Sequence, residues 1–248
     1  MIPDGAAGPA AARAAIARQL RVGGFLPFTS TDYPDAIGAV VFCQGCPWRC
    51  GYCHNPHLIP AHGDDERDFA RILVWLASRR GLLDAVVFSG GEPTAQTELL
   101  AAIDAVRALR FAVGLHTGGA YPRRLAQVLP RVDWVGIDVK SSTADYSGVT
   151  RIPGSGLTAL ASLDLVLNAG IAYEVRTTMH PMLTPPAVME RLARELAARG
   201  VERWILQAFR ATGCANEDVV AAAPQGATLD PALLARLSEQ VPVIEVRG

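Results

Sequence analysis

Short apolar segments alternate with amphipathic segments along most of this chain, and this alternation restricts the folds open to it. Apolar runs typical of buried strands predict strands at Ile37–Phe42, Ala85–Ser89, Ala112–His116, Trp134–Asp138, Tyr173–Thr178, Trp204–Gln207 and Val243–Val246. Helical spacing of apolar residues predicts helices over Arg67–Ser78, Glu98–Leu109, Arg123–Leu129, Leu157–Asn168, Pro186–Arg199 and Pro231–Gln240. Repeated strand-then-helix units are typical of a parallel sheet or barrel. We therefore predict an α/β fold with about six βα units, an incomplete TIM-like (β/α)6 barrel.

The length and the composition indicate one domain. The chain has 248 residues, of which 50% are hydrophobic, enough for a single large core or barrel. Residues 1–24 are rich in Ala and Arg and are predicted to form a partly helical N-terminal extension, with the barrel domain over residues 25–248. Ala211–Thr228 is predicted to be a long loop.

Charge and hydropathy disfavour several classes of partner. The net charge is −1 and no long run of like charge occurs, so we expect no nucleic acid partner and no binding to an anionic membrane surface. No apolar run reaches spanning length, and the first 20 residues lack the uninterrupted apolar core of a signal peptide. We expect a cytoplasmic protein without a membrane partner.

Polar and glycine-rich residues gather after the predicted strands and not before them. They occur at Gly45–Asn55, Gly90–Thr94, Thr117–Gly119 and Asp138–Ser142, and at His180. Chemistry in parallel α/β folds lies at the carboxyl ends of the strands, so these segments are expected to converge on one face.

Three cysteines directly follow the first predicted strand. Cys46, Cys50 and Cys53 are separated by three and then two residues, and three thiolates from one short loop can bind three irons of a cubane. The alternative is a zinc site that also uses Cys43, although pairs of zinc ligands are usually separated by about a dozen residues. Cys43, near the strand end, is expected to be a buried small hydrophobe, and Cys214 a free thiol.

The cysteine spacing, with Tyr52 before the last thiol, resembles the signature of the radical S-adenosylmethionine (SAM) superfamily. The resemblance implies a barrel of radical SAM type, a [4Fe–4S] cluster on Cys46, Cys50 and Cys53, and contact between Tyr52 and the adenine region of SAM. The longer string from Gln44 to Pro56, with Asp32-Tyr-Pro34 upstream, is similar to activating enzymes of glycyl-radical enzymes, particularly the activating proteins of anaerobic ribonucleoside-triphosphate reductase.

A glycine turn ends the second predicted strand. Ser89-Gly-Gly-Glu-Pro-Thr94 allows close backbone approach, and its carboxylate can accept hydrogen bonds from an ammonium group. The string resembles the GGE motif of the superfamily, which implies that Gly90, Gly91 and Glu92 hold the amino group of SAM. Thr94 is expected to act only as a helix cap.

The next strand ends extend the resemblance. Lys140 is the only lysine among 23 basic residues, which indicates a site where arginine does not serve, or a chance surface residue. Asp138 and Lys140 match positions that contact SAM or a monovalent cation in the activating enzymes. His116 replaces the usual Asp, which puts such a cation site in doubt. His180, and less strongly Arg176, are placed near SAM by the resemblance; the alternative for Arg176 is an ion pair with Glu174 or Asp138.

The resemblance implies reductive cleavage of SAM to methionine and a 5′-deoxyadenosyl radical, which installs a glycyl radical on a partner such as anaerobic ribonucleotide reductase. It also implies flavodoxin or ferredoxin as the electron donor. No catalytic acid or base is expected beyond the cluster and the cofactor. Two alternatives stay open: a radical SAM enzyme acting on a small molecule, similar to 7-carboxy-7-deazaguanine synthase, and a non-catalytic metal-binding protein.

Overall fold

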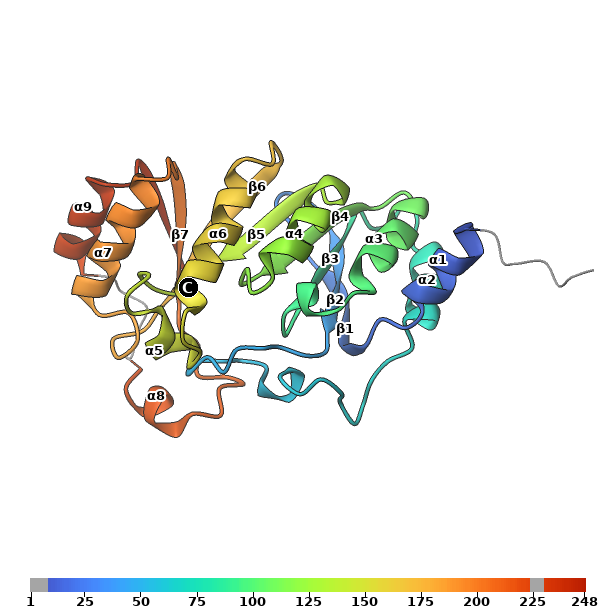
Figure 1. Cartoon of the computed structure of the whole chain (residues 1–248), viewed down its shortest axis with the longest axis horizontal. Helices are drawn as coiled ribbons and strands as arrows, with labels where there is room; N and C mark the ends of the chain where they lie inside the picture. Colours follow the sequence, from blue (N-terminus) through green and yellow to red (C-terminus); the bar gives the residue numbers. More distant parts are fainter. Residues whose placement is uncertain (1–8, 224–229) are drawn as a thin grey trace, which may run out of the picture.

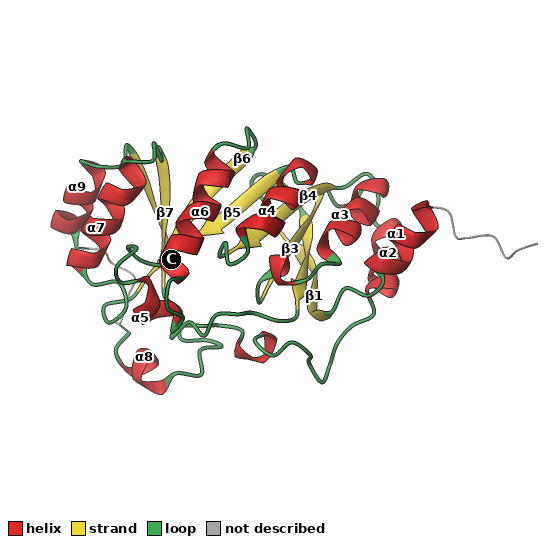
Figure 2. Cartoon of the chain, viewed as in Figure 1, coloured by secondary structure: helices red, strands yellow, loops and turns green. Residues whose placement is uncertain are grey.

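A computed structural model describes residues 9–223 and 230–248 of the chain. One sheet of eight strands runs through the molecule in the order β1 to β8, with helices packed along it (Figures 1 and 2). The strands are β1 Val22–Thr29, β2 Gly38–Cys43, β3 Ala85–Gly90, β4 Ala112–Thr117, β5 Trp134–Asp138, β6 Ala172–Met179, β7 Arg203–Ala208 and β8 Val243–Arg247.

The α-helices are α1 Pro9–Ala17, α2 Phe69–Ala77, α3 Leu99–Ala108, α4 Pro122–Val128, α5 Tyr146–Thr150, α6 Ser155–Leu167, α7 Pro186–Ala197, α8 Glu217–Ala221 and α9 Pro231–Ser238. Short 3-10 turns are η1 Pro56–Leu58, η2 Pro93–Ala95 and η3 Leu129–Arg131. Each of the six steps from β2 to β8 is bridged by a helix, and β2 through β8 pair in parallel. The predicted α/β fold with six βα units is confirmed. β1 and β8 are the two edge strands of the sheet, so each pairs with one neighbour only.

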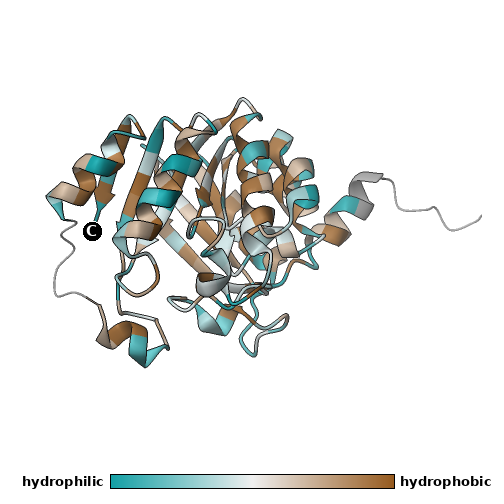
Figure 3. Cartoon of the chain, turned by 60° about the vertical axis from the view of Figure 1, so that its left-hand side comes forward, coloured by the Kyte–Doolittle hydropathy of each residue, from teal (hydrophilic) through white to brown (hydrophobic). Residues whose placement is uncertain are grey.

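The two faces of the sheet differ in chemistry. One face packs its apolar side chains against the helices and forms the main core, with Phe88, Ile137 and Trp204 fully buried. In Figure 3 the strands are largely hydrophobic, and teal residues lie along the helices. The other face of β4, β5 and β6 carries small and polar residues, because strand alternation places Gly136 and Arg176 opposite that core.

The N-terminal part contributes a strand that the sequence pattern did not predict. β1 pairs antiparallel with β2 at the edge of the sheet, and its Leu26 and Phe28 are exposed. Gly23, Gly24 and Pro27 weaken the strand pattern of this segment, and an edge strand tolerates them. Ala17 and Leu20, inside the predicted extension, belong to the main core. Residues 1–8 lie outside the described residues, and the boundary at residue 24 stays a prediction.

The predicted loop over Ala211–Thr228 is wrong in one part, since it contains helix α8. The Asn216 side chain accepts a hydrogen bond from Val219 N and caps this short helix. Residues 224–228 of the predicted loop lie outside the described residues. Among the described residues, no helix combines the length and the apolar character needed to cross a membrane.

Candidate active site

A cavity of about 310 Å³ opens at the carboxyl ends of the parallel strands, and we call it the inner cavity. Of the predicted site residues, the structure brings the following to its wall: Cys46, Cys50, Cys53, Tyr52, Gly90, Gly91, Glu92, Asp138 and Lys140. His180 does not line it. The volume is near the lower end of the range for small-molecule sites, so the inner cavity suits one ligand of moderate size.

The loop that carries the cysteines is fixed by backbone hydrogen bonds from both sides. Cys46 N donates to Ile59 O at 3.0 Å, and Gly51 N donates to Val149 O of α5 at 3.0 Å. The three thiols are partly buried and form no disulfide. Cys43 lies on β2 and is fully buried in the main core, as predicted for a small hydrophobe.

The thiols do not form a site for a single metal ion in this structure. Within residues 9–223 and 230–248, no group of three His, Cys, Asp or Glu side chains is placed to hold one. A cubane needs no such convergence, because each thiolate binds a different iron. Burial raises the pKa of Cys46 to about 12 and also raises the pKa of Cys50, so bound iron would have to stabilise the thiolates.

The glycine turn after β3 approaches the cysteine loop through its backbone. Gly90 has a φ of +113°, and a Cβ there would lie 2.5 Å from Cys43 N. A Cβ on Gly91 would lie 2.5 Å from Gly45 O. Only glycine fits both positions, so the turn packs directly against the start of the cysteine loop.

The Glu92 carboxylate is buried and held by protein donors. Oε1 accepts hydrogen bonds from Thr94 N at 3.1 Å, Thr94 Oγ1 at 2.5 Å and Thr117 Oγ1 at 2.7 Å, and Oε2 accepts one from Gly118 N at 2.9 Å. Glu92 therefore caps η2, and the predicted role of Thr94 as the cap is wrong. Because Oε2 has one protein donor, it keeps acceptor capacity toward the inner cavity.

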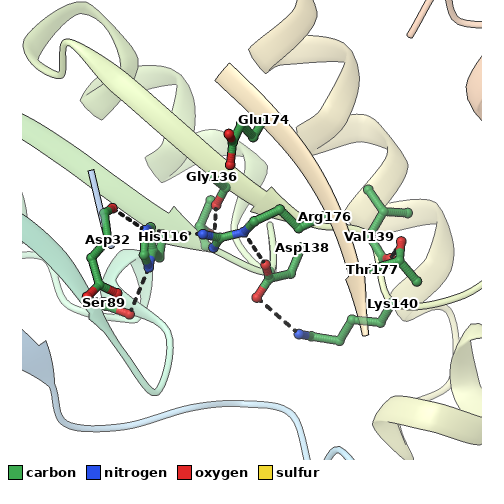
Figure 4. A network of polar contacts seen from close by, with 12 residues as sticks. Asp32, Ser89, His116, Gly136, Asp138, Val139, Lys140, Glu174, Arg176 and Thr177 are labelled. Carbon is green, nitrogen blue, oxygen red and sulfur yellow. Dashed lines mark hydrogen bonds and ion pairs between the residues drawn. The ribbon is translucent and has the colours of Figure 1, made fainter. Parts of the chain in front are cut away.

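Asp138 joins two cations at the wall of the inner cavity (Figure 4). Its Oδ1 accepts from Arg176 Nε at 3.0 Å, and its Oδ2 lies 3.6 Å from Lys140 Nζ. Burial would raise the pKa of Asp138, but the Arg176 and Lys140 charges outweigh it and lower that pKa. Lys140 Nζ also lies 5.8 Å from the Tyr52 ring centroid. Arg176 thus pairs with Asp138 and not with Glu174, which instead binds Arg247.

Arg176 fits because its neighbour on β5 has no side chain. A Cβ on Gly136 would lie 2.6 Å from Arg176 Cζ, and Arg176 Nη2 donates to Gly136 O at 3.4 Å. Because Gly136 and Arg176 lie on neighbouring strands, the glycine clears the space in which the guanidinium meets Asp138.

His116 is held neutral beside this network. Its Nε2 lies 2.9 Å from Asp32 O and 3.2 Å from Arg176 Nη1, while Nδ1 lies 3.4 Å from Ser89 Oγ. A carbonyl only accepts, so we assign the proton to Nε2, which leaves Nδ1 as an acceptor. Burial and the Arg176 charge lower the pKa of His116 to about 3.

His180 lies outside the inner cavity because both of its ring nitrogens are used elsewhere. Nε2 donates to Val219 O at 2.9 Å, and Nδ1 accepts from Met182 N at 3.2 Å. The ring is 1% exposed and meets Phe209 edge to face. In this arrangement His180 ties the end of β6 to α8, so we leave it out of the proposed SAM contacts.

The family follows from comparison with known proteins. The family model described as the radical SAM superfamily matches residues 40–194, which include the cysteine loop, the glycine turn and Lys140. The chain belongs to the radical SAM superfamily. Enzymes of this family use a [4Fe–4S] cluster and SAM, and both are cofactors of this chain.

Individual relatives agree with the predicted branch of the family. A putative glycyl-radical enzyme activating enzyme of Methanocaldococcus jannaschii is 27% identical over 208 residues, covering 79% of this chain and 83% of the relative. Pyruvate formate-lyase-activating enzyme of Clostridium pasteurianum is 33% identical over 157 residues, covering 60% of this chain and 64% of the relative. These matches bear out the resemblance to radical SAM activating enzymes.

A solved structure confirms the fold. Streptococcus suis SuiB bound to S-adenosylmethionine superposes with a TM-score of 0.60 at 13% identity, over 83% of this chain and 48% of that chain. Our chain therefore spans about half the length of SuiB. The prediction of a partial barrel of radical SAM type is borne out, and the alternative of a non-catalytic metal-binding protein is not, because the chain is a radical SAM enzyme.

The residues present fit both cofactors. The three thiols and the turn at Gly90–Gly91 border one cavity, and Lys140 reaches it from the carboxyl end of β5. Sequence reasoning gave no role to Asp32, Ser89 and Thr178, which also line the inner cavity. Ser89 and Thr178 each lie at the end of a predicted strand, and this position was the signal that could have found them. Asp32 follows β1, a strand that was not predicted.

Proposed function

We propose that this radical SAM enzyme installs a glycyl radical on a partner protein, and that the partner is an anaerobic ribonucleotide reductase. The observation that supports the proposal is the likeness, over 79% of this chain, to the putative glycyl-radical enzyme activating enzyme of Methanocaldococcus jannaschii. The inner cavity, of about 310 Å³, is the space in which we place SAM.

Each part of the chain has a task in this proposal. Cys46, Cys50 and Cys53 would hold the cluster, while Glu92 Oε2 and Lys140 would bind the amino and carboxylate groups of SAM. When bound, the cluster and SAM together supply a 5′-deoxyadenosyl radical, which takes one hydrogen atom from a glycine Cα. Asp138 fixes Lys140 at 3.6 Å, so the ammonium group is oriented before SAM binds.

The docked partner would also exclude water from the mouth of the inner cavity. A primary carbon radical must meet its target before it meets solvent, and a protein loop that seals the opening provides that exclusion. Arg210 and His54 lie at the wall of this cavity, and His54 Nε2 is fixed by Arg210 O at 2.8 Å. These residues are available to contact the backbone of an entering loop.

The electron donor and the location remain as predicted from the sequence. We propose flavodoxin or ferredoxin as the donor, because each cleavage of SAM takes one electron and neither the chain nor SAM supplies it. We propose the cytoplasm as the location, since the clustered thiols need a reducing compartment to bind iron.

The test is anaerobic. The reconstituted enzyme is mixed with SAM, dithionite and purified anaerobic ribonucleotide reductase, and the electron paramagnetic resonance spectrum is recorded for a glycyl radical while 5′-deoxyadenosine is quantified. The control is a reductase whose radical-bearing glycine is changed to alanine. We expect a glycyl radical with the native partner and none with the control.

Two results would contradict the proposal. A glycyl radical on pyruvate formate-lyase but not on the reductase would reassign the partner within the same activity. Deoxyadenosine that accumulates with a small-molecule substrate, and with no glycyl radical on either protein, would favour the small-molecule alternative.

A further inference from the structure

The Arg176 guanidinium lies between two residues whose positions the resemblance to activating enzymes associates with a monovalent cation. These residues are Asp138 and His116, where those enzymes usually have a second Asp. Arg176 Nε donates to Asp138 Oδ1 at 3.0 Å, and Arg176 Nη1 lies 3.2 Å from His116 Nε2 (Figure 4). Arg176 lines the inner cavity and is only 8% exposed. A positive charge fixed to the chain therefore lies where a bound ion would otherwise supply one.

His116 is unsuited to bind Na⁺ or K⁺. These ions are hard cations that bind oxygen, and their sites are favoured by negative charge. The His116 ring offers no oxygen, and its Nε2 carries a proton that is donated to Asp32 O at 2.9 Å. Burial and the Arg176 charge lower the pKa of His116 to about 3, so the ring is neutral at pH 7. Residue 116 thus brings neither the ligand atom nor the charge that an Asp would bring.

The oxygens of Asp138 are already shared by two cations. Oδ1 accepts the hydrogen bond from Arg176, and Oδ2 lies 3.6 Å from Lys140 Nζ. A third cation between residues 116 and 138 would be attracted by one carboxylate and repelled by two positive groups. The neighbouring hydroxyl of Thr117 is also engaged, because it donates to Glu92 Oε1 at 2.7 Å.

The other two carboxylates that line the inner cavity have partners of their own. Glu92 Oε1 accepts hydrogen bonds from Thr94 and Thr117, and Asp32 Oδ2 accepts one from Thr29 Oγ1 at 2.5 Å. The residues present therefore do not fit a monovalent cation between positions 116 and 138.

The guanidinium of Arg176 is held in this place by several fixed partners. Gly136 leaves the space for it, since a Cβ there would lie 2.6 Å from Arg176 Cζ, and Gly136 O accepts from Arg176 Nη2 at 3.4 Å. The Trp134 ring lies below it, with its centroid 5.9 Å from Cζ. A planar group fixed in this way keeps its geometry without an ion that can dissociate.

We infer that Arg176 takes the place of a monovalent cation in this chain, so that the enzyme binds SAM equally well without Na⁺ or K⁺. Arg176 acts here as a positioning residue, which holds Asp138 and, through it, the ammonium group of Lys140. The inference goes beyond the proposed function, because it holds whichever substrate receives the radical.

The experiment compares salts at equal ionic strength: potassium chloride, sodium chloride and tetramethylammonium chloride, whose cation is too large and too weakly coordinating to bind such a site. Anaerobic calorimetry measures the affinity of the reconstituted enzyme for SAM in each salt. Thermal unfolding of the protein without cofactors is followed in the same salts, which gives a measurement that does not depend on the cluster. Neither measurement requires a glycyl radical, so a failure of the proposed function leaves this test intact.

Three variants accompany the native enzyme. Arg176→Met removes the guanidinium, and His116→Asp/Arg176→Met also supplies the second carboxylate. The matched control is Arg199→Met, which removes an arginine that pairs with Asp164 at 3.1 Å away from the inner cavity. Iron content shows whether each variant holds its cluster.

We expect the native enzyme and Arg199→Met to bind SAM with the same affinity in all three salts, and their Tm to be the same in each. Arg176→Met should bind SAM about tenfold more weakly in every salt, because a buried charged partner is lost and His116 gives an ion no ligand. His116→Asp/Arg176→Met should regain about tenfold in affinity in K⁺ or Na⁺ only, and its Tm should rise with the concentration of that ion.

A native enzyme whose affinity for SAM falls about tenfold in tetramethylammonium would overturn the inference, as would a Tm of the native protein that rises specifically with K⁺ or Na⁺. These two comparisons need no variant, so they decide the question even if a substitution prevents folding. A folded His116→Asp/Arg176→Met variant with no dependence on the salt would also contradict it, because Arg176 would then not occupy the place of an ion.

Discussion

Removing the charge of Asp138 should destabilise the protein far more than removing the charge of a surface aspartate. In Asp138→Asn, Arg176 and Lys140 lose the carboxylate between them, and their side chains are only 9% and 13% exposed. Breaking a buried ion pair by removing one partner costs about 3–5 kcal/mol. Because Asp138 itself is 34% exposed, water can replace part of the interaction, and we expect about 3 kcal/mol.

The matched control is Asp164→Asn. Asp164 also pairs with an arginine, Arg199 Nε at 3.1 Å, but its side chain is 52% exposed. An exposed pair contributes about 0.5 kcal/mol. The difference between the two variants should therefore be about 2–3 kcal/mol.

The assay is urea denaturation of the protein without its cofactors at pH 7, supported by thermal unfolding. For a chain of this length, 3 kcal/mol corresponds to a fall in Tm of about 6–12 °C. The double variant Asp138→Asn/Arg176→Met should lose less than the sum of the single variants, because it removes the uncompensated guanidinium. If Asp138→Asn loses no more stability than Asp164→Asn, the carboxylate does not hold the two cations as argued.

Three further variants test the site. The His116→Gln variant should be less sensitive to acid than the native protein. The pKa of His116 is about 3 in the folded state and about 6.5 in the unfolded state, so at pH 5 the native protein loses about 2 kcal/mol of unfolding free energy that the variant keeps. The same dependence of unfolding free energy on pH in both proteins would refute this. Glu92→Gln should keep its iron and lower deoxyadenosine formation at least about tenfold by loss of a charged acceptor, whereas unchanged cleavage would remove Glu92 from the SAM site. Gly90→Ala should lower the free energy of unfolding, measured by urea denaturation, by about 3 kcal/mol. The control Gly170→Ala should lower it by about 1 kcal/mol, because Gly170 also has a positive φ but has open space around it. Equal losses would mean that the backbone at Cys43 shifts to make room for the added Cβ.

The sequence was sufficient for the elements whose information is local. Strand and helix periodicity predicted all seven parallel strands, because a strand covered by helices is apolar along its length. The cysteine loop and the Gly90–Gly91 turn were also visible, since each is a short string placed after a strand. β1 was not visible, because its glycines and Pro27 break the pattern that an edge position tolerates.

Contacts between distant segments could not be read from the chain. The resemblance of its strand end placed His180 near SAM, but its partner is Val219, 39 residues further along, in a helix that was predicted to be loop. The pairing of Arg176 was left open between Glu174 and Asp138, and only the register of β5 against β6, with Gly136 as the neighbour that clears the space, decides it.

The barrel interior explains why a chain so poor in lysine keeps one here. Arg176 fills the space above Gly136 with a planar guanidinium that reaches Asp138, Gly136 O and the edge of His116. Lys140 extends between Gly118 and Tyr52: a Cβ on Gly118 would lie 3.4 Å from Lys140 Cε, and Nζ lies 5.8 Å from the Tyr52 ring centroid. The compact charge leaves its remaining donors free for a carboxylate in the inner cavity. Asp138 thus holds two cations of different shape, the planar guanidinium of Arg176 on Oδ1 and the compact ammonium of Lys140 near Oδ2.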